Sequence, residues 1–233
     1  MFHPIDHPLE RGWVGRVDGE HVIQLAAQTL QSLFTGGGSA REHAVYPLAR
    51  VRLLAPVLHP PAVRVFEDQT TFAFANPAAI VGPGADVRAS RDARSSSRMR
   101  AELALLARVA GIVGGDSAIA GFTIFADWRE PGRVPPKDRD FALGLGPIVV
   151  TPDELDPGGL EAIVRSDGSE RTRDTLGDFD WQGAQDLVAD GTRLYPGDLL
   201  VAPALVAVDG VPHGSSVELE VPGIGVLEQV VGR

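Results

Sequence analysis

The sequence predicts a mainly β protein of the α+β class, on two observations. Short stretches rich in valine, isoleucine, leucine and phenylalanine alternate with turns along the 233 residues, which include 27 glycines and 18 prolines. The sequence also lacks the strand–helix alternation of a doubly wound nucleotide-binding sheet, and it contains neither a Gly-x-Gly-x-x-Gly motif nor a phosphate-binding loop. We therefore expect many short strands around a β core, with few helices.

The first fifty residues are expected to form a small N-terminal α+β unit. Two stretches that alternate apolar with polar side chains flank Asp18-Gly19, which is a typical hairpin signal. Apolar residues at helical spacing predict a helix over residues 24–34, before a run of glycines. We place a domain boundary after residue 50, so that residues 1–50 form this unit and residues 51–233 form a larger C-terminal domain.

The larger domain is expected to consist mainly of strands. Apolar or alternating stretches between turn residues predict strands at 62–66, 71–74, 98–108, 119–126, 148–150, 160–166, 199–202, 217–221 and 226–231. Asp167-Gly168 predicts a second hairpin turn. Helices are expected at residues 151–154, where a threonine precedes a proline, and at residues 180–190. The polar segment 88–98 is expected to be a solvated loop.

Composition narrows the possible function classes. The chain has no cysteine, which excludes disulfide scaffolds, thiolate metal sites and cysteine nucleophiles. Its net charge of −10 argues against a nucleic-acid partner. No apolar run approaches the roughly 20 residues of a membrane-spanning helix, and the first residues lack a signal-peptide pattern. We therefore expect a cytoplasmic globular protein that handles a small molecule or another protein.

One lysine stands out among the 21 basic residues, because the other 20 are arginines. A bias of this kind is typical of a GC-rich genome, in which a surface cation is almost always arginine. A lysine that persists indicates a need for a compact amine, which arginine cannot imitate, although a single lysine can also survive by accident. Lys137 is therefore a candidate functional residue.

Several carboxylates and arginines accompany the predicted strands. Strand alternation places Arg100 and Glu102 on one face, where the alternative to a functional pair is a solvated ion pair. Asp127 ends an apolar strand, and Trp128 follows it. Asp140 lies three residues after the single lysine, shortly before another glycine-rich strand.

These pieces, in this order, resemble the fumarylacetoacetate hydrolase family. The matching segments are Ile80-Val81-Gly82-Pro83-Gly84, Ala101-Glu102-Leu103-Ala104, residues 119–127, Lys137 with Asp140, residues 146–151, residues 194–200 and residues 222–227. Each segment alone is a weak signal, whereas the ordered set across roughly residues 51–233 is specific. Residues 14–19 also resemble the opening of the family's small N-terminal unit.

The resemblance implies both a fold and a chemistry. The expected fold is a mixed β-roll or sandwich core, usually in a homodimer. Members of the family bind divalent cations such as Mg²⁺ or Mn²⁺ through carboxylates. They act on small 2-oxo acids or 1,3-dicarbonyl compounds by C–C bond hydrolysis, decarboxylation or tautomerisation. Hard cations prefer oxygen ligands, and such an ion stabilises the enolate that develops in these reactions.

The resemblance also assigns positions in the site. Glu102 and Asp127 hold family metal-ligand positions, Lys137 holds the position of the substrate-binding lysine, and Arg100 replaces the first glutamate of the ligand strand. A like-charge pair at about 4 Å costs on the order of 4 kcal/mol at an effective dielectric constant near 20. We therefore hypothesise that the Arg100 guanidinium takes the metal position and pairs with both carboxylates. No metal is then expected in the usual geometry, and Mg²⁺ or Mn²⁺ only if the family site survives.

Other parts of the family site are altered. The histidine-bearing loop that normally follows the strand at 62–66 is shortened and carries no histidine. Val65 stands where longer members have a metal-binding aspartate, and Phe72 lies near the expected histidine. The usual Thr-Gly-Thr is replaced by Ala202-Pro203-Ala204. Glu67 is a candidate general base, and the alternative is an exposed turn carboxylate.

The sequence leaves three candidates for substrate binding and three interpretations of the function open. The substrate-binding candidates are Arg129, Trp128 and Asp140. The alternative for Arg129 is an ordinary surface charge, and the alternative for Trp128 is packing in the core. In the first interpretation, the chain is an enzyme of the family with an altered centre, in which Arg100 and Lys137 supply positive charge for an enolate. Alternatively, it is a catalytically inactive structural or regulatory subunit, or a small-molecule binding protein.

Overall fold

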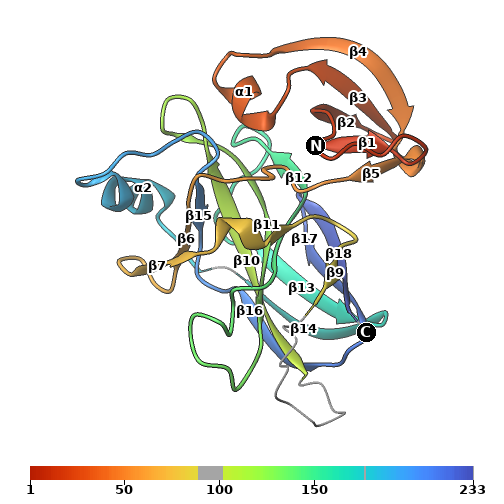
Figure 1. The fold of residues 1–233 in the computed structure, drawn as a ribbon. Helices are drawn as coiled ribbons and strands as arrows, with labels where there is room; N and C mark the ends of the chain where they lie inside the picture. Colours follow the sequence, from red (N-terminus) through yellow and green to blue (C-terminus); the bar gives the residue numbers. More distant parts are fainter. Residues whose placement is uncertain (89–101, 176, 233) are drawn as a thin grey trace.

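The computed structural model of the chain describes residues 1–88, 102–175 and 177–232. Within these ranges the protein is mainly β, which confirms the predicted fold class. The described strands form sheets of two, three, five and eight strands (Figure 1). Neither of the two α-helices found in these ranges is long and apolar enough to cross a membrane.

Two small sheets are formed mainly by strands from the first fifty residues. Their strands are β1 (Phe2–Pro4), β2 (Gly15–Asp18), β3 (His21–Ala26), β4 (Ser39–Pro47) and β5 (Val51–Leu53). The strands β2, β3 and β4 form an antiparallel sheet, and β1 pairs with β5. The hairpin predicted at Asp18-Gly19 is present between β2 and β3. The β1–β5 pairing crosses the boundary expected after residue 50, and that division of the chain stays a prediction.

The helix predicted over residues 24–34 is shorter than expected. The strand β3 continues to Ala26, and α1 covers only Leu30–Phe34. The side chain of Thr29 accepts a hydrogen bond from the Ser32 amide at 3.1 Å, and Ser32 Oγ accepts one from the Thr29 amide at 3.1 Å, so a capping box begins the helix. The predicted helical spacing is correct only over this last part, where Leu30 and Phe34 pack against the core.

The eight-stranded sheet occupies the centre of the molecule (Figure 1). In spatial order its strands are β7 (Phe72–Ala75), β6 (Val63–Phe66), β15 (Leu199–Val201), β10 (Leu103–Val113), β11 (Ile119–Arg129), β12 (Leu143–Val150) and β8 (Ile80–Val81), and β16 (Val206–Val211) also pairs with β10. The antiparallel strands β10 and β11 are the longest, at 11 residues each. Both extend beyond the predicted strand ends: β10 continues through the apolar residues 109–113, and β11 continues through Asp127, Trp128 and Arg129.

The five-stranded sheet carries the second predicted hairpin. In spatial order its strands are β14 (Ser169–Thr175), β13 (Glu161–Ser166), β17 (Ser216–Val221), β18 (Gly225–Val231) and β9 (Asp86–Val87). Asp167 and Gly168 join β13 to β14 with φ angles of 50° and 76°. Two successive positive φ values fit the type I′ turn that the dipeptide predicted.

One of the two helices predicted in the larger domain is present. The helix α2 covers Trp181–Ala189, and the Asp180 side chain caps it by accepting a hydrogen bond from the Gly183 amide at 2.9 Å. The helix predicted at residues 151–154 is wrong, because this segment makes a single turn around the Thr151 carbonyl and then leaves it. Single 3₁₀ turns also occur at Leu48–Arg50 and Pro77–Ala79.

Side-chain alternation divides the core into two main apolar clusters. Odd-numbered residues of β10, such as Leu105 and Val109, join the larger cluster, which also contains residues of the five-stranded sheet. Even-numbered residues, such as Ala110 and Ile112, join the second cluster on the opposite face. Arg108 lies on this even-numbered face, and the candidate site begins there.

Candidate functional site

A buried ion pair lies where the even-numbered face of β10 changes from apolar to charged. The register of β10 and β11 places Leu106 opposite Asp127 and Arg108 opposite Phe125. Arg108 and Asp127 are therefore diagonal neighbours on adjacent strands. Each side chain is only 1% exposed, and Arg108 Nε lies 3.3 Å from Asp127 Oδ2.

A second arginine engages both oxygens of the same carboxylate. Arg129, two residues along β11, donates from Nε to Asp127 Oδ1 at 2.9 Å and from Nη2 to Oδ2 at 2.6 Å. This is the bidentate geometry that guanidinium and carboxylate groups favour. Burial acts to lower the pKa of Arg129, but its hydrogen bonds and charge attraction to Asp127 raise that pKa overall.

The Arg108 side chain spans three elements. Its Nη1 donates to the carbonyl oxygens of Phe66 at 2.9 Å and Ala202 at 3.1 Å, at the ends of β6 and β15. Its Nη2 lies 3.6 Å from Glu67 Oε2. Burial lowers the pKa of Arg108 below its usual value, while attraction to Asp127 and Glu67 opposes the shift. The structure therefore holds a cation in a buried position.

Further charged residues extend this pair toward the surface. Glu67 begins the turn after β6, its side chain is 49% exposed, and its Oε1 lies 3.7 Å from Arg139 Nη1. Asp138 Oδ2 lies 3.7 Å from Arg129 Nη1. We call the connected set the arginine–carboxylate cluster; its members are Glu67, Arg108, Asp127, Arg129, Asp138 and Arg139. Its three positive and three negative formal charges balance.

The arginine–carboxylate cluster contains unsatisfied polar atoms. Within the described residues, Arg108 Nε, Arg139 Nη1 and Asp138 Oδ1 are buried and have no hydrogen-bond partner. Buried polar atoms in folded proteins nearly always have a partner, either in the protein or in ordered water. The cluster therefore has the capacity to bind a further polar group.

Lys137 lies in the loop between β11 and β12, and its amine forms an ion pair with Asp140 rather than Asp127. The lysine side chain is 66% exposed. Asp140 also accepts a hydrogen bond from Asn76 Nδ2 at 2.6 Å, and the hydrogen bonds from Lys137 and Asn76 hold the pKa of Asp140 below its usual value. The loop therefore packs against the end of β7, and it brings Arg139, not Lys137, to Glu67.

This geometry can be set beside known proteins. The family model described as "Fumarylacetoacetate (FAA) hydrolase C-terminal" matches residues 47–232. The chain belongs to the fumarylacetoacetate hydrolase family. The resemblance predicted from the sequence motifs is thereby confirmed. The match extends almost to the end of the chain, so it includes every member of the arginine–carboxylate cluster.

Relatives in the family cover most of the chain. Protein Rv2993c of Mycobacterium tuberculosis is 29% identical over 217 residues, covering 81% of each chain. Two solved structures share the fold. The 2-hydroxyhepta-2,4-diene-1,7-dioate isomerase from Mycobacterium marinum has a TM-score of 0.73 and 23% identity, and the match covers 95% of this chain and 93% of that one. The maleylpyruvate hydrolase from Sphingobium sp. SYK-6, in complex with manganese and pyruvate, has a TM-score of 0.74 and 20% identity, and the match covers 96% of this chain and 98% of that one. Their names describe an isomerase and a hydrolase, and at these identities the comparison shows a shared fold.

The residues predicted from the sequence motifs as metal ligands, Glu102 and Asp127, do not fit a divalent ion in the usual way. Both oxygens of Asp127 accept hydrogen bonds from Arg129, and the Arg108 cation lies beside Oδ2. Glu102 is exposed, and it lies four residues, or about 13 Å, along the chain from the residue opposite Asp127. A hard ion needs free carboxylate oxygens at roughly 2.0–2.6 Å, whereas guanidinium groups already engage both oxygens of Asp127. The described part of the chain also contains no group of three His, Asp or Glu side chains suited to a metal.

Arg100 lies outside the described residues, so its hypothesised pairing with Glu102 and Asp127 stays a prediction; the guanidinium groups that the structure places on Asp127 belong to Arg108 and Arg129. The substrate-binding role predicted for Trp128 is wrong. Its side chain is fully buried on the opposite face of β11, and its indole donates to Gln229 Oε1 at 2.7 Å.

Sequence reasoning missed Arg108 and Arg139. Arg108 is the only charged residue in the stretch 103–113, and extending the strand alternation by two steps beyond Ala104 places it on the face of Glu102. That signal was available. Arg139 had no such signal, because its approach to Glu67 depends on the path of the loop between β11 and β12.

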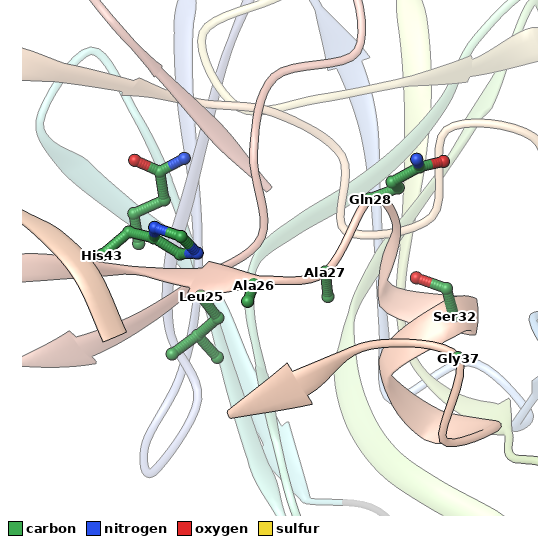
Figure 2. A pocket seen from close by; sticks show the side chains of 8 residues that line it. Leu25, Ala26, Ala27, Gln28, Ser32, Gly37 and His43 are labelled. Carbon is green, nitrogen blue, oxygen red and sulfur yellow. The ribbon is translucent and has the colours of Figure 1, made fainter. Parts of the chain in front are cut away.

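Two open grooves lie elsewhere on the molecule. Figure 2 shows the first, which residues of β3, β4 and the α1 region line. Phe34, Thr35, residues 114–116 and residues 118–120 line the second. His43 is the only titratable side chain among the eight residues that line the first groove. This groove therefore lacks the paired charges of the arginine–carboxylate cluster, which is the better candidate for chemistry.

Proposed function

We propose that this chain is an enzyme that acts on a small 2-oxo acid or 1,3-dicarbonyl compound, with the Arg108 guanidinium supplying the positive charge that a divalent ion supplies elsewhere. The observation that carries the proposal is the buried Arg108 cation, 3.3 Å from a carboxylate at a family metal-ligand position. The structures of maleylpyruvate hydrolase and of the heptadiene-dioate isomerase support the substrate class through their names.

The chemistry requires a fixed positive charge. Hydrolysis of the C–C bond, decarboxylation and tautomerisation of such compounds all develop negative charge on an enolate oxygen. A preorganised cation in a water-poor environment stabilises this charge more strongly than a cation in bulk water. Arg108 meets the requirement because Asp127 and the two carbonyl oxygens fix its guanidinium in place.

The other residues of the site have supporting roles in this proposal. Arg129 fixes the position of the Asp127 carboxylate by its bidentate contact. Lys137 and Asp140 belong to the loop that carries Arg139, and they bring a second positive charge and a hydrogen-bonding group near the substrate. No step requires a metal, since the carboxylate at the family ligand position is already engaged by two arginines.

The test is an activity panel with oxaloacetate and acylpyruvates, assayed with EDTA and with added Mn²⁺. We expect turnover in EDTA, and a loss of at least about 100-fold in Arg108→Gln, the usual scale for removing one electrostatic stabiliser. Arg165→Gln is the matched control, because Arg165 pairs with Glu220 on the other sheet. Turnover that requires Mn²⁺, or an undiminished Arg108→Gln enzyme, would contradict the proposal.

A second candidate is an inactive family member that serves as a structural or regulatory subunit or as a small-molecule binding protein. The short turn between β6 and β7, which has no histidine, and the sequence Ala202-Pro203-Ala204 favour it. Pyruvate binding without turnover of any compound in the panel would support it over the enzyme. A homodimer and a cytoplasmic location also belong to the proposal, and the mass of the purified protein in solution tests the dimer.

A further inference from the structure

We propose that Glu67 is an internal ligand, which occupies the place where Arg108 and Arg139 bind the carboxylate of a substrate. The inference rests on the proposed function for the class of ligand, a small 2-oxo acid. It goes beyond that function because it assigns a binding pair and a competing group within the same chain. It also gives Glu67 a role different from the general base expected from the sequence.

The contacts of Glu67 indicate a bridging carboxylate without fitted hydrogen bonds. Its Oε2 lies 3.6 Å from Arg108 Nη2, and its Oε1 lies 3.7 Å from Arg139 Nη1. Charge-assisted hydrogen bonds between such groups are usually about 2.7–2.9 Å long. Charge attraction therefore holds the Glu67 carboxylate between two guanidinium groups, while its attachment to the backbone keeps it beyond hydrogen-bond distance of both.

Guanidinium donors lie on both sides of this carboxylate without a short hydrogen bond to it. Arg139 Nη1, 3.7 Å from Glu67 Oε1, is buried and has no hydrogen-bond acceptor among the described residues, and Arg108 Nη2 lies 3.6 Å from Glu67 Oε2. The Arg108 side chain is 1% exposed, so bulk water does not take the place of a partner. A free carboxylate, which has two acceptor oxygens and no tether, can approach these donors more closely than Glu67 does.

The surroundings of Glu67 allow its side chain to leave without unfolding the turn. The Glu67 amide donates to the Thr71 carbonyl oxygen at 2.9 Å. Asp68 Oδ1 accepts from the amides of Thr70 and Thr71, both at 2.8 Å. These bonds fix the backbone, whereas the half-exposed Glu67 carboxylate makes only two long ion pairs. Displacement of the side chain therefore breaks no short hydrogen bond in which it takes part.

The test is calorimetric titration of pyruvate, in EDTA, into the full-length protein. We expect Glu67→Gln to bind pyruvate at least about tenfold more tightly than the unaltered protein, because the competing charge is removed. Arg139→Gln should bind it about tenfold more weakly. Glu220→Gln, which removes a carboxylate from Arg165 on the other sheet, should bind it as the unaltered protein does. Methyl pyruvate, which lacks the carboxylate, should gain nothing from Glu67→Gln.

Several results would overturn the inference. The inference fails if the Glu67→Gln protein binds pyruvate no more tightly than the unaltered protein does. It also fails if the affinity for methyl pyruvate rises as much as the affinity for pyruvate, because Glu67 then does not compete with a carboxylate. Glu67→Gln that loses turnover with unchanged pyruvate affinity shows a general base instead. The two proposals fail separately: tighter binding without turnover in any variant supports the internal ligand and rejects the enzyme. Turnover in EDTA without tighter pyruvate binding by Glu67→Gln supports the enzyme and rejects the internal ligand.

Discussion

The two buried arginine–aspartate pairs of the central sheet differ in what surrounds them. Arg64 on β6 donates to Asp198 at 3.0 Å, and the same Asp198 oxygen accepts from the Tyr195 amide at 3.1 Å. Arg64 also lies over the Phe74 ring at 5.5 Å. Within the described residues, this ion pair contains one arginine and one carboxylate, and it fixes a turn before β15.

The pair of Arg108 and Asp127 belongs instead to a connected series of charges. Two arginines share Asp127, and the series continues through Glu67 and Arg139 to the half-exposed edge of the cluster. The pair of Arg64 and Asp198 also contains an unpaired buried atom, Asp198 Oδ1, but both of its side chains are buried. The series reaches the surface at the half-exposed Glu67, so it can offer a binding place to a ligand from solvent. This difference leads to separate expectations for variants of the two pairs.

The largest effect on stability is expected from Asp127→Asn. The change leaves Arg108 buried beside a neutral group, and removing one partner of a buried ion pair typically costs about 3–5 kcal/mol. The free energy of unfolding, measured with urea by circular dichroism, should fall by this amount. A loss below about 1 kcal/mol would show that the carbonyl oxygens of Phe66 and Ala202 are sufficient to hold the Arg108 cation.

A smaller effect is expected from Asp198→Asn. Arg64 is 7% exposed and keeps its contact with Phe74, and an asparagine oxygen can still accept from the Tyr195 amide. We expect a loss of about 1.5–3 kcal/mol in the free energy of unfolding, the usual value of a hydrogen bond to a charged group. Pyruvate affinity and turnover per folded molecule should not change. A change in either would erase the functional distinction between the two pairs.

The smallest effect on stability is expected from Lys137→Ala, because exposed ion pairs contribute only about 0–1 kcal/mol. The pKa of Asp140 in the folded protein lies below 3.8, so its ion pair stabilises the protein above that pH. This contribution disappears as the pH falls through the folded-state pKa. Urea unfolding at neutral and acidic pH should therefore show a small difference that vanishes in acid.

Turnover of Lys137→Ala provides a separate measurement. In the proposed function, Lys137 brings positive charge near the substrate, so turnover should fall at neutral pH by far more than the loss of stability explains. Asp140→Asn is the matched variant, because it breaks the same ion pair and keeps the lysine. If both variants lose turnover equally, the ion pair acts through the position of the loop rather than through the amine.

The fold was largely predictable because apolar alternation and turn chemistry are local signals. They located β6, β11, β17 and both hairpins, and the ordered motifs located the family. The strands β4 and β14 were missed because their polar, mostly exposed side chains do not alternate, so that pairing with neighbouring strands decides their structure. The helix expected over residues 24–34 was overestimated because β3 takes up its first residues.

The candidate site was less predictable. Asp127 was found from the predicted strand end and the family motifs, and an arginine partner was expected for it. The sequence indicated Arg100, which lies outside the described residues, and the structure places Arg108 and Arg129 on Asp127. The pairing depends on the register of β10 against β11, which places Arg108 diagonally to Asp127. The contact between Arg139 and Glu67 depends on two loops that are far apart in the sequence. Alternation alone cannot supply either relationship.

The two carbonyl oxygens that Arg108 binds bear on protein engineering. A designer who wished to install a divalent ion at Asp127 would remove Arg108 and free the carboxylate from Arg129. The carbonyl groups of Phe66 and Ala202 would then lose their donor, at about 1–3 kcal/mol for each group left buried without a replacement. Conversion of this centre to metal dependence therefore requires coordinated changes at the ends of β6, β10, β11 and β15, and a single substitution will not achieve it.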